Sequence, residues 1–94
     1  MRQDLMRYFG RASGSVQGVG FRYFVQKNAM DMNVTGWVRN MEDSTVTMEL
    51  QGTEADINVL TKRIRAGSFF IKVRELVLKK IEVIADDEGF SIRN

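Results

Sequence analysis

The sequence predicts one α+β domain over residues 1–94, with two helices packed on one face of an antiparallel sheet. A chain of 94 residues suffices for a single small domain. Hydrophobic residues make up 44% of the chain, so a core can form and disorder is not expected. Segments with strand and helix periodicity follow one another in the order β-α-β-β-α-β, with one short extra strand at the end. This order is that of the split βαβ, or ferredoxin-like, layout.

Four segments in the first half of the chain carry strand or helix signals. Residues 5–12 contain two adjacent aromatic residues, which favour a strand. Apolar side chains recur at helical spacing in residues 21–32, and we expect Asn33 to follow this helix as a left-handed cap. Residues 34–40 and 45–51 are predicted to form a hairpin. In its second strand, Val46, Met48 and Leu50 should face the core, and the alternate residues should face solvent, namely Thr45, Thr47, Glu49 and Gln51.

The second helix has recognisable signals at both ends. Thr53 and Asp56 have the spacing of a capping box, and Gly67 is expected to end the helix. Its buried stripe consists of Ile57, Leu60 and Ile64. Three basic residues near its end suit the helix dipole, and we interpret them as a solvated helix end rather than a binding patch: Lys62, Arg63 and Arg65.

The last third of the chain is rich in strand signals. The apolar alternation in residues 71–84 changes phase, which predicts a bulge or bend. Residues 86–89 form a turn, whose carboxylates we expect to be solvated: Asp86, Asp87 and Glu88. A short final strand follows at 90–92.

Composition excludes several kinds of chemistry. The chain contains no cysteine and no histidine, which removes disulfides, thiolate chemistry and the commonest general base and metal ligand. The net charge of +2 is too small to argue for a nucleic-acid partner. No long apolar run suggests a signal peptide or membrane span. We therefore expect a soluble, cytoplasmic monomer without a nucleic-acid or membrane partner.

The run Gly14-Ser15-Val16-Gln17-Gly18-Val19-Gly20-Phe21-Arg22 is the first candidate site. A glycine-rich loop that turns into a helix N-terminus directs unpaired backbone N–H groups at one point, which suits a phosphate. Arg22 would add a planar, permanently charged fork. The run lacks the endings of the nucleotide P-loop and of the dinucleotide fingerprint. A tight turn without a ligand is the alternative interpretation.

A second run, Gly36-Trp37-Val38-Arg39-Asn40, ends at a predicted turn. Asparagine is also a common turn residue, and the sequence does not place Asn40 near Arg22. Together the two runs, at this spacing, resemble the two signatures of the acylphosphatases. The resemblance extends over nearly the whole chain and includes Val46, Gly52 and the segment 90–93.

The resemblance implies a hydrolase that converts acyl phosphates to a carboxylate and inorganic phosphate. It implies that Arg22 binds the phosphoryl group and that Asn40 positions the attacking water. Backbone N–H groups would come from the phosphate-binding loop, which comprises Ser15, Val16, Gln17, Gly18, Val19, Gly20 and Phe21. No metal or organic cofactor is expected.

The sequence departs from the family pattern at three places. Ser15 stands where a basic residue is frequent, Ser44 follows an acid where glycine is frequent, and residues 67–71 lack the usual prolines. These departures affect turn geometry and substrate preference rather than the reaction. The alternative function is a non-catalytic module of the same fold, which would bind RNA or a small regulatory ligand. However, aromatic residues that bind RNA belong on central strands, whereas here they open a helix.

Overall fold

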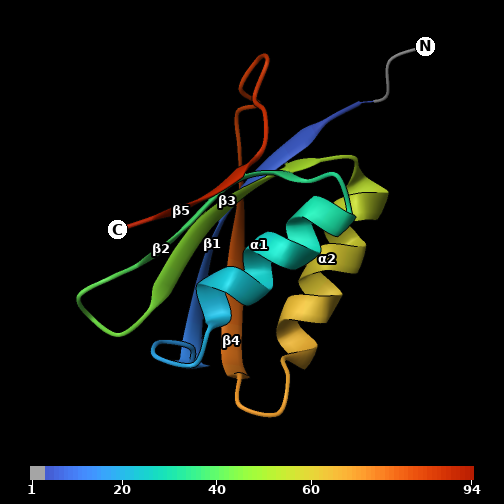
Figure 1. The fold of residues 1–94 in the computed structure, drawn as a ribbon. Coiled ribbons are helices and arrows are strands. Elements are labelled where there is room, and N and C mark those ends of the chain that lie inside the picture. The colour runs from blue at the N-terminus through green and yellow to red at the C-terminus, as the bar shows by residue number, and fades with distance from the viewer. Residues whose placement is uncertain (1–3) are drawn as a thin grey trace.

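The computed structural model describes residues 4–94, which form two helices and a five-stranded sheet (Figure 1). The elements in chain order are β1 (Met6–Ser15), α1 (Phe21–Asp31), β2 (Thr35–Asn40), β3 (Val46–Gly52), α2 (Glu54–Ala66), β4 (Lys72–Ile81) and β5 (Phe90–Arg93). The predicted α+β, ferredoxin-like order is thus confirmed, with the final strand included. No helix in this part of the chain is long and apolar enough to cross a membrane.

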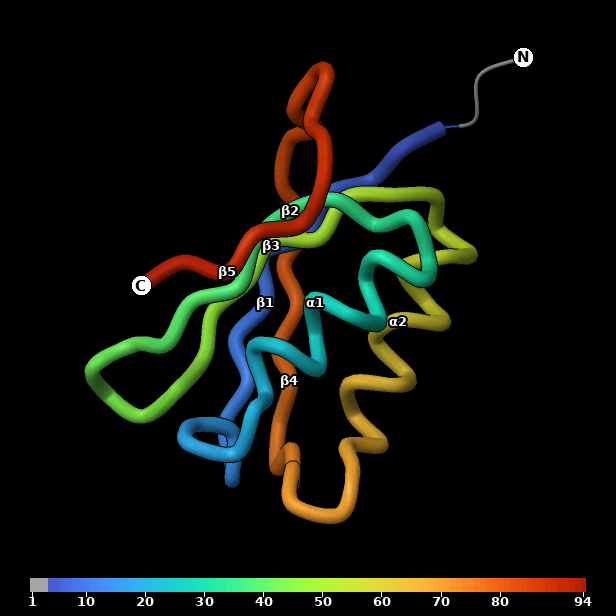
Figure 2. Tube along the Cα trace, in the orientation of Figure 1, coloured from blue at the N-terminus to red at the C-terminus, as the bar shows by residue number. Residues whose placement is uncertain are grey.

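The strands lie in the order β4-β1-β3-β2-β5. β1 pairs antiparallel with both β3 and β4, and β2 pairs antiparallel with β3. β5 pairs parallel with β2, so the sheet is mixed rather than wholly antiparallel as expected. After β4, at one edge of the sheet, the chain crosses to the other edge (Figure 2). There β5 lies beside β2 and runs in the same direction as β2.

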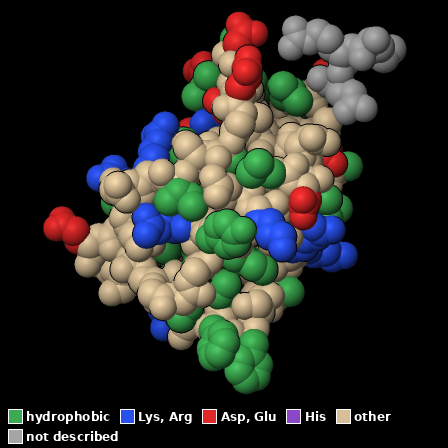
Figure 3. Space-filling model, viewed as in Figure 1, with side chains coloured by type: hydrophobic (Ala, Val, Ile, Leu, Met, Phe, Trp, Pro, Cys, Tyr) green, Lys and Arg blue, Asp and Glu red, His purple; other side chains and the backbone are tan. Residues whose placement is uncertain are grey.

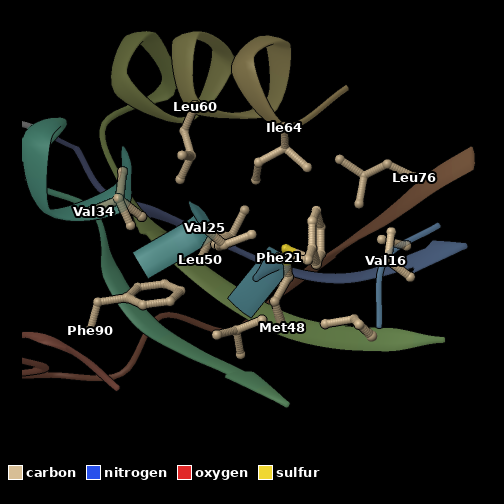
Figure 4. Close-up of a cluster of buried hydrophobic side chains, with 14 of the residues drawn as sticks. Val16, Phe21, Val25, Val34, Met48, Leu50, Leu60, Ile64, Leu76 and Phe90 are labelled. Carbon is tan, nitrogen blue, oxygen red and sulfur yellow. The ribbon is translucent and has the colours of Figure 1, made fainter. Parts of the chain in front are cut away.

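The core lies between one face of the sheet and the two helices (Figures 1 and 4). Val46, Met48 and Leu50 are fully buried, as the alternation predicts. From the helices, the side chains in the core include Phe21, Val25 and Ala29 of α1 and Ile57, Leu60 and Ile64 of α2. The helical periodicity therefore identified the buried faces correctly.

The helix boundaries also follow the sequence signals. α1 spans Phe21–Asp31, one residue shorter than predicted, and Asn33 has a left-handed φ of 57°. The hydroxyl of Thr53 accepts a hydrogen bond from the backbone N–H of Asp56, 3.2 Å away. Gly67 ends α2 with a φ of 67°.

The first strand is longer than predicted, because β1 continues to Ser15 instead of ending at Ala12. Its last residues pair with β4 across an irregularity: Ser13 pairs with Glu75 but Gly14 pairs with Val73. Arg74 is the extra residue, so the predicted bulge is confirmed. Gly14 has a φ of 122°, and a Cβ there would clash with the carbonyl oxygen of Lys72. The pairing of β1 with β4 at this irregularity therefore requires glycine at this position.

The face of the sheet opposite the helices is partly covered, which the alternation did not predict. Thr47 and Gln51 were expected to face solvent, but they are only 7% and 4% exposed. The side-chain amide of Gln51 donates a hydrogen bond to the backbone carbonyl of Ile84, and its Oε1 accepts one from the backbone N–H of Ile84. The chain between β4 and β5 is therefore tied to this face. Residues 82–84 lie outside β4, although strand was predicted to residue 84.

A buried arginine joins the same connection to the sheet. Arg7 is 1% exposed, and its guanidinium donates hydrogen bonds to Glu49 at 2.7 Å and Asp87 at 2.8 Å. Burial lowers the pKa of Arg7, but the hydrogen bonds to Asp87 and Glu49 outweigh it, so that the pKa lies above its ordinary value. The prediction of a solvated carboxylate was therefore wrong for Asp87.

Candidate active site

The glycine loop connects the end of β1 to the start of α1. Val16 is buried in the core, whereas Gly18 and Gly20 are exposed and have left-handed φ angles of 76° and 79°. A Cβ at either glycine would meet open space, so the backbone conformation, and not crowding, favours glycine here. The open space also leaves the loop backbone accessible to a ligand.

The loop ends at an uncapped helix N-terminus. Gly20 is the N-cap of α1, and no side chain of residues 4–94 caps this end of the helix. The first-turn N–H groups, which a helix cannot satisfy internally, therefore remain able to donate to a ligand. The partial positive charge of the helix N-terminus favours an anion at the same place.

Arg22 and Asn40 line one cavity. Its volume is about 210 Å³, and its lining consists of Val16, Gly18, Gly20, Phe21, Arg22, Tyr23, Asn40 and Ile92. The topology explains this proximity: β3 pairs antiparallel with both β1 and β2, so the latter two run in the same direction and end at the same edge. The sequence left the distance between the two runs open, and the sheet order resolves it.

Asn40, one of the lining residues, carries an unsatisfied polar atom. Its Oδ1 is buried and accepts no hydrogen bond from the described residues. A buried acceptor without a partner is costly, and a bound water or ligand is an ordinary way to satisfy it. The turn interpretation of Asn40 does not account for this atom, because a turn asparagine uses its side chain to bond the nearby backbone.

Arg22 is held from the far edge of the sheet. Its Nη1 donates a hydrogen bond to the backbone carbonyl oxygen of Arg93 in β5, 3.1 Å away. The guanidinium of Arg93 lies 4.8 Å from the ring centroid of Trp37, a cation–π contact that packs β5 against β2. The resemblance included the segment 90–93, but sequence reasoning assigned neither Arg93 nor Ile92 to the site. A backbone carbonyl leaves no sequence signal, and both placements depend on the parallel pairing of β5 with β2.

Gln17 fixes the loop to the hairpin between β2 and β3. Its side-chain amide donates to the backbone carbonyls of Met41 and Thr45, both 2.8 Å away. This side chain points into the turn that follows Asn40 and does not line the cavity. The first run is therefore hydrogen-bonded to the turn that directly follows the second run, which the sequence did not predict.

The structure divides the predicted loop residues into two groups. Four of them line the cavity: Val16, Gly18, Gly20 and Phe21. Val19 packs against the core, and Ser15 lines a separate hollow with the start of β4. Of the aromatic residues that open α1, Phe21 is 1% exposed and Tyr23 is 65% exposed, and both lie on a helix rather than on the central strands where RNA-binding aromatic residues belong. Among residues 4–94, no group of three or more His, Cys, Asp or Glu side chains is placed to hold a metal ion.

Sequence comparisons identify relatives over nearly the whole chain. The model of the Acylphosphatase family matches residues 8–92. An acylphosphatase from Clostridium acetobutylicum is 45% identical over 86 residues, covering 92% of this chain and 94% of that protein. An acylphosphatase from Geobacillus kaustophilus is 46% identical over 79 residues, covering 84% of each protein.

Structural comparisons agree with this assignment. The crystal structure of acylphosphatase from Bacillus subtilis has a TM-score of 0.89 at 34% identity, covering 95% of this chain and 99% of that one. Full-length HypF, in its phosphate- and nucleotide-bound form, has a TM-score of 0.90 at 28% identity, but the match covers only 12% of HypF. The fold, the two runs and these relatives together show that the chain belongs to the acylphosphatase family, the hydrolases that cleave the carboxyl-phosphate bond of acyl phosphates.

Proposed function

We propose that Arg22 and the N–H groups of the loop bind the phosphoryl group of an acyl phosphate, and that Asn40 positions the attacking water. The observation that carries this proposal is the shared cavity: Asn40, whose Oδ1 is buried and unpaired, lines it together with Arg22 and residues of the glycine loop. A cavity of about 210 Å³ is smaller than the ~300–1,000 Å³ typical of sites for drug-sized ligands. It therefore suits a phosphoryl group better than a whole nucleotide.

The charges in the site favour the transition state of phosphoryl transfer. The guanidinium of Arg22 provides planar, permanently charged donors, and the loop and helix N-terminus provide neutral ones. Phosphoryl transfer requires mainly positioning and charge stabilisation. Donors arranged in advance around the equatorial oxygens supply both without a covalent intermediate on the enzyme.

Asn40 acts on the water. Its Oδ1 can accept a hydrogen bond from one O–H of the water, which directs the oxygen lone pair at phosphorus. As the new P–O bond forms, the bond between phosphorus and the carboxylate oxygen breaks, and the carboxylate leaves with the electron pair. Asparagine cannot take a proton, so the water proton passes to a phosphate oxygen or to bulk water. The products are a carboxylate and inorganic phosphate.

We also propose that the chain acts in the cytoplasm as a monomer and without a nucleic-acid partner. The absence of cysteine suits a reducing compartment, and the net charge of +2 is small. The departures from the family pattern bear on substrate preference. Ser15 supplies no charge beside the loop, so we expect weak selection of the acyl group at this position.

Hydrolysis of benzoyl phosphate in isotopically labelled water, with a chelator present, tests the proposed function. Attack of water on phosphorus places the label in inorganic phosphate, whereas attack on the acyl carbon places it in benzoate. We expect chelator-resistant turnover with the label in phosphate. Label in benzoate, or activity that disappears with the chelator and returns with a divalent ion, would refute the mechanism.

A further inference from the structure

The connection between α2 and β4 exposes two adjacent aromatic side chains. Phe69 is 82% exposed and Phe70 is 69% exposed. Their rings contact each other edge to face, with the ring centroids 4.8 Å apart. Figure 3 shows hydrophobic side chains protruding at the end of the molecule where Figure 1 places this connection. We call these two residues the phenylalanine tip. Neither residue belongs to the core or to the cavity of the active site.

The phenylalanine tip lies within a strongly basic segment. Residues 61–74, the basic segment, contain five of the 14 Lys and Arg residues and none of the 12 Asp and Glu residues. The rest of the chain therefore has nine cations against 12 carboxylates. All five cations are exposed, including the three that we interpreted from the sequence as a solvated helix end rather than a binding patch: Lys62, Arg63, Arg65, Lys72 and Arg74.

These five charges are not neutralised within the protein. Both ion pairs among residues 4–94 belong to Arg7, so none involves the basic segment. Arg63 and Arg65 donate hydrogen bonds to neutral acceptors, Oδ1 of Asn28 and the carbonyl of Leu76. Lys72 and Arg74 line an open hollow of about 530 Å³, which Asp43 also lines. Acidic side chains gather instead at the opposite end of the molecule, over the β4–β5 connection (Figure 3).

We propose that the phenylalanine tip and the basic segment form a docking surface for an anionic lipid bilayer. Two apolar rings at the end of a convex loop can enter the boundary between headgroups and acyl chains, while flanking cations meet lipid phosphates. This proposal departs from the expectation of no membrane partner, which rested on the lack of a spanning segment, because peripheral docking requires no such segment. This inference does not rest on the chemistry assigned to Arg22.

The size and the charge of this surface favour a bilayer over two other occupants, namely a protein partner and a second copy of the chain. A stable protein interface buries about 800 Å² on each side, whereas one phenylalanine buries about 150–250 Å². Two rings on a narrow tip therefore do not make such an interface. A second copy of the chain would bring two basic segments together, and their like charges would repel.

Flotation with lipid vesicles tests the proposal. The full chain is mixed with vesicles of phosphatidylcholine alone, or of equal parts phosphatidylcholine and phosphatidylglycerol. We expect flotation with the anionic vesicles only, and its loss near 1 M salt, where the Debye length is about 3 Å. Failure of the parent protein to float with anionic vesicles would overturn the proposal.

Variants separate the two parts of the surface. Phe69→Ser combined with Phe70→Ser should weaken partitioning more than about tenfold, because the apolar contribution is lost. Lys72→Gln combined with Arg74→Gln should weaken it by roughly fivefold for each charge. Met30→Ser is the matched control, since Met30 is 61% exposed on α1 and lies outside the basic segment, and it should float like the parent. A phenylalanine variant that floats as well as the parent would refute docking through the tip.

Two further measurements keep the outcomes distinct. Sedimentation velocity without lipid tests for self-association. If the parent forms a dimer that the phenylalanine variant does not form, and the parent does not bind vesicles, the tip serves self-association and the proposal is overturned. Benzoyl phosphate hydrolysis by the phenylalanine variant should equal that of the parent, which shows that the variant is folded. A parent that floats but does not hydrolyse acyl phosphates would refute the proposed function and leave the docking surface supported.

Discussion

The side chain of Arg22, at the start of α1, donates a hydrogen bond to the backbone carbonyl of Arg93, the next-to-last residue of the sequence. The side chain that we assign to the phosphoryl group is thus oriented by the last strand of the sheet. The hydrogen bond occupies Nη1 and leaves the other guanidinium N–H groups able to reach the cavity. Arg22 therefore enters the site already oriented, which reduces the entropy lost when a phosphate binds.

Replacement of Arg22 should abolish both turnover and phosphate binding. Arg22→Ala removes the permanent charge, and we expect a loss of about 10²–10³ in turnover. Arg22→Lys should recover little, because an ammonium cannot make a two-pronged contact. Inorganic phosphate stabilises a folded protein that binds it, so phosphate should raise the melting temperature of the parent but not of Arg22→Ala. Equal stabilisation of both proteins would show that Arg22 is not the phosphate ligand.

Replacement of Asn40 should separate turnover from binding. Asn40→Ala removes the acceptor that we assign to the water, and we expect turnover to fall by about 10² or more. Phosphate should still raise its melting temperature, since Arg22 and the loop remain. The same two measurements, turnover of benzoyl phosphate and thermal melting with phosphate, apply here. Full activity in Asn40→Ala would remove the role given to this residue.

Loss of the Gln17 side chain should loosen the loop. Gln17→Ala removes two hydrogen bonds to the hairpin, each contributing about 1 kcal/mol to stability. We expect a lower melting temperature together with weaker phosphate binding. Gln26→Ala is the matched control, because Gln26 also bonds a backbone carbonyl, that of Phe90, but belongs to α1 and not to the glycine loop. Equal losses of phosphate binding in both variants would show that loop anchoring has no specific effect.

The turn between β2 and β3 should show a pH-dependent stability. The hydroxyl and the backbone N–H of Thr45 donate to the carboxylate of Asp43 and lower its pKa. A lowered folded-state pKa adds stability above the unfolded-state pKa, and this stability is lost as pH falls through the folded-state value. Asp43→Asn should therefore have a lower melting temperature than the parent at neutral pH, and the two melting temperatures should converge as the pH falls into the acid range. A difference in melting temperature that is constant with pH would contradict this prediction.

Replacement of Arg7 should destabilise the fold without changing the residues that line the active-site cavity. Arg7→Met leaves Glu49 and Asp87 without their cation, and we expect unfolding to require about 2–4 kcal/mol less free energy. The raised pKa keeps Arg7 charged up to strongly alkaline pH, so this loss should be independent of pH over the working range. Arg11→Met is the control, since Arg11 is exposed on the same strand, and urea unfolding measures both. A loss in Arg7→Met no larger than that of the control would show that this ion cluster does not stabilise the fold.

Local signals predicted most of the fold. The apolar periodicity of α1 and α2, the capping residue Thr53 and the inward-facing apolar positions of β3 are properties of short segments, and each is confirmed. The burial of Gln51 was not predicted, because it depends on a distant connection that folds over the sheet. Hydrophobic patterning identifies apolar positions that face the core, but it does not show which polar positions later become covered.

The candidate site also contains residues that the sequence predicted and residues that it did not. Arg22 and Asn40 lie in runs that the sequence singled out, and the structure brings them into one cavity. The contributions of Arg93 and of the Gln17 side chain were missed. Both use backbone carbonyls as partners, and any residue type supplies such a group. The roles of Arg22 and Asn40 in the reaction stay predictions.

β1, which precedes the other four strands in chain order, lies in the interior of the sheet. Ala12 of β1 is flanked by Val46 on one side and by Leu76 on the other, and both neighbours are synthesised much later. Pairing on each side must close a long chain loop before its contacts add stability. During synthesis, β1 therefore leaves the ribosome without a partner on either edge, and the sheet can form completely only when most of the chain has emerged. We expect slow, late folding of the nascent chain, with the exposed edges of β1 as its main risk of aggregation.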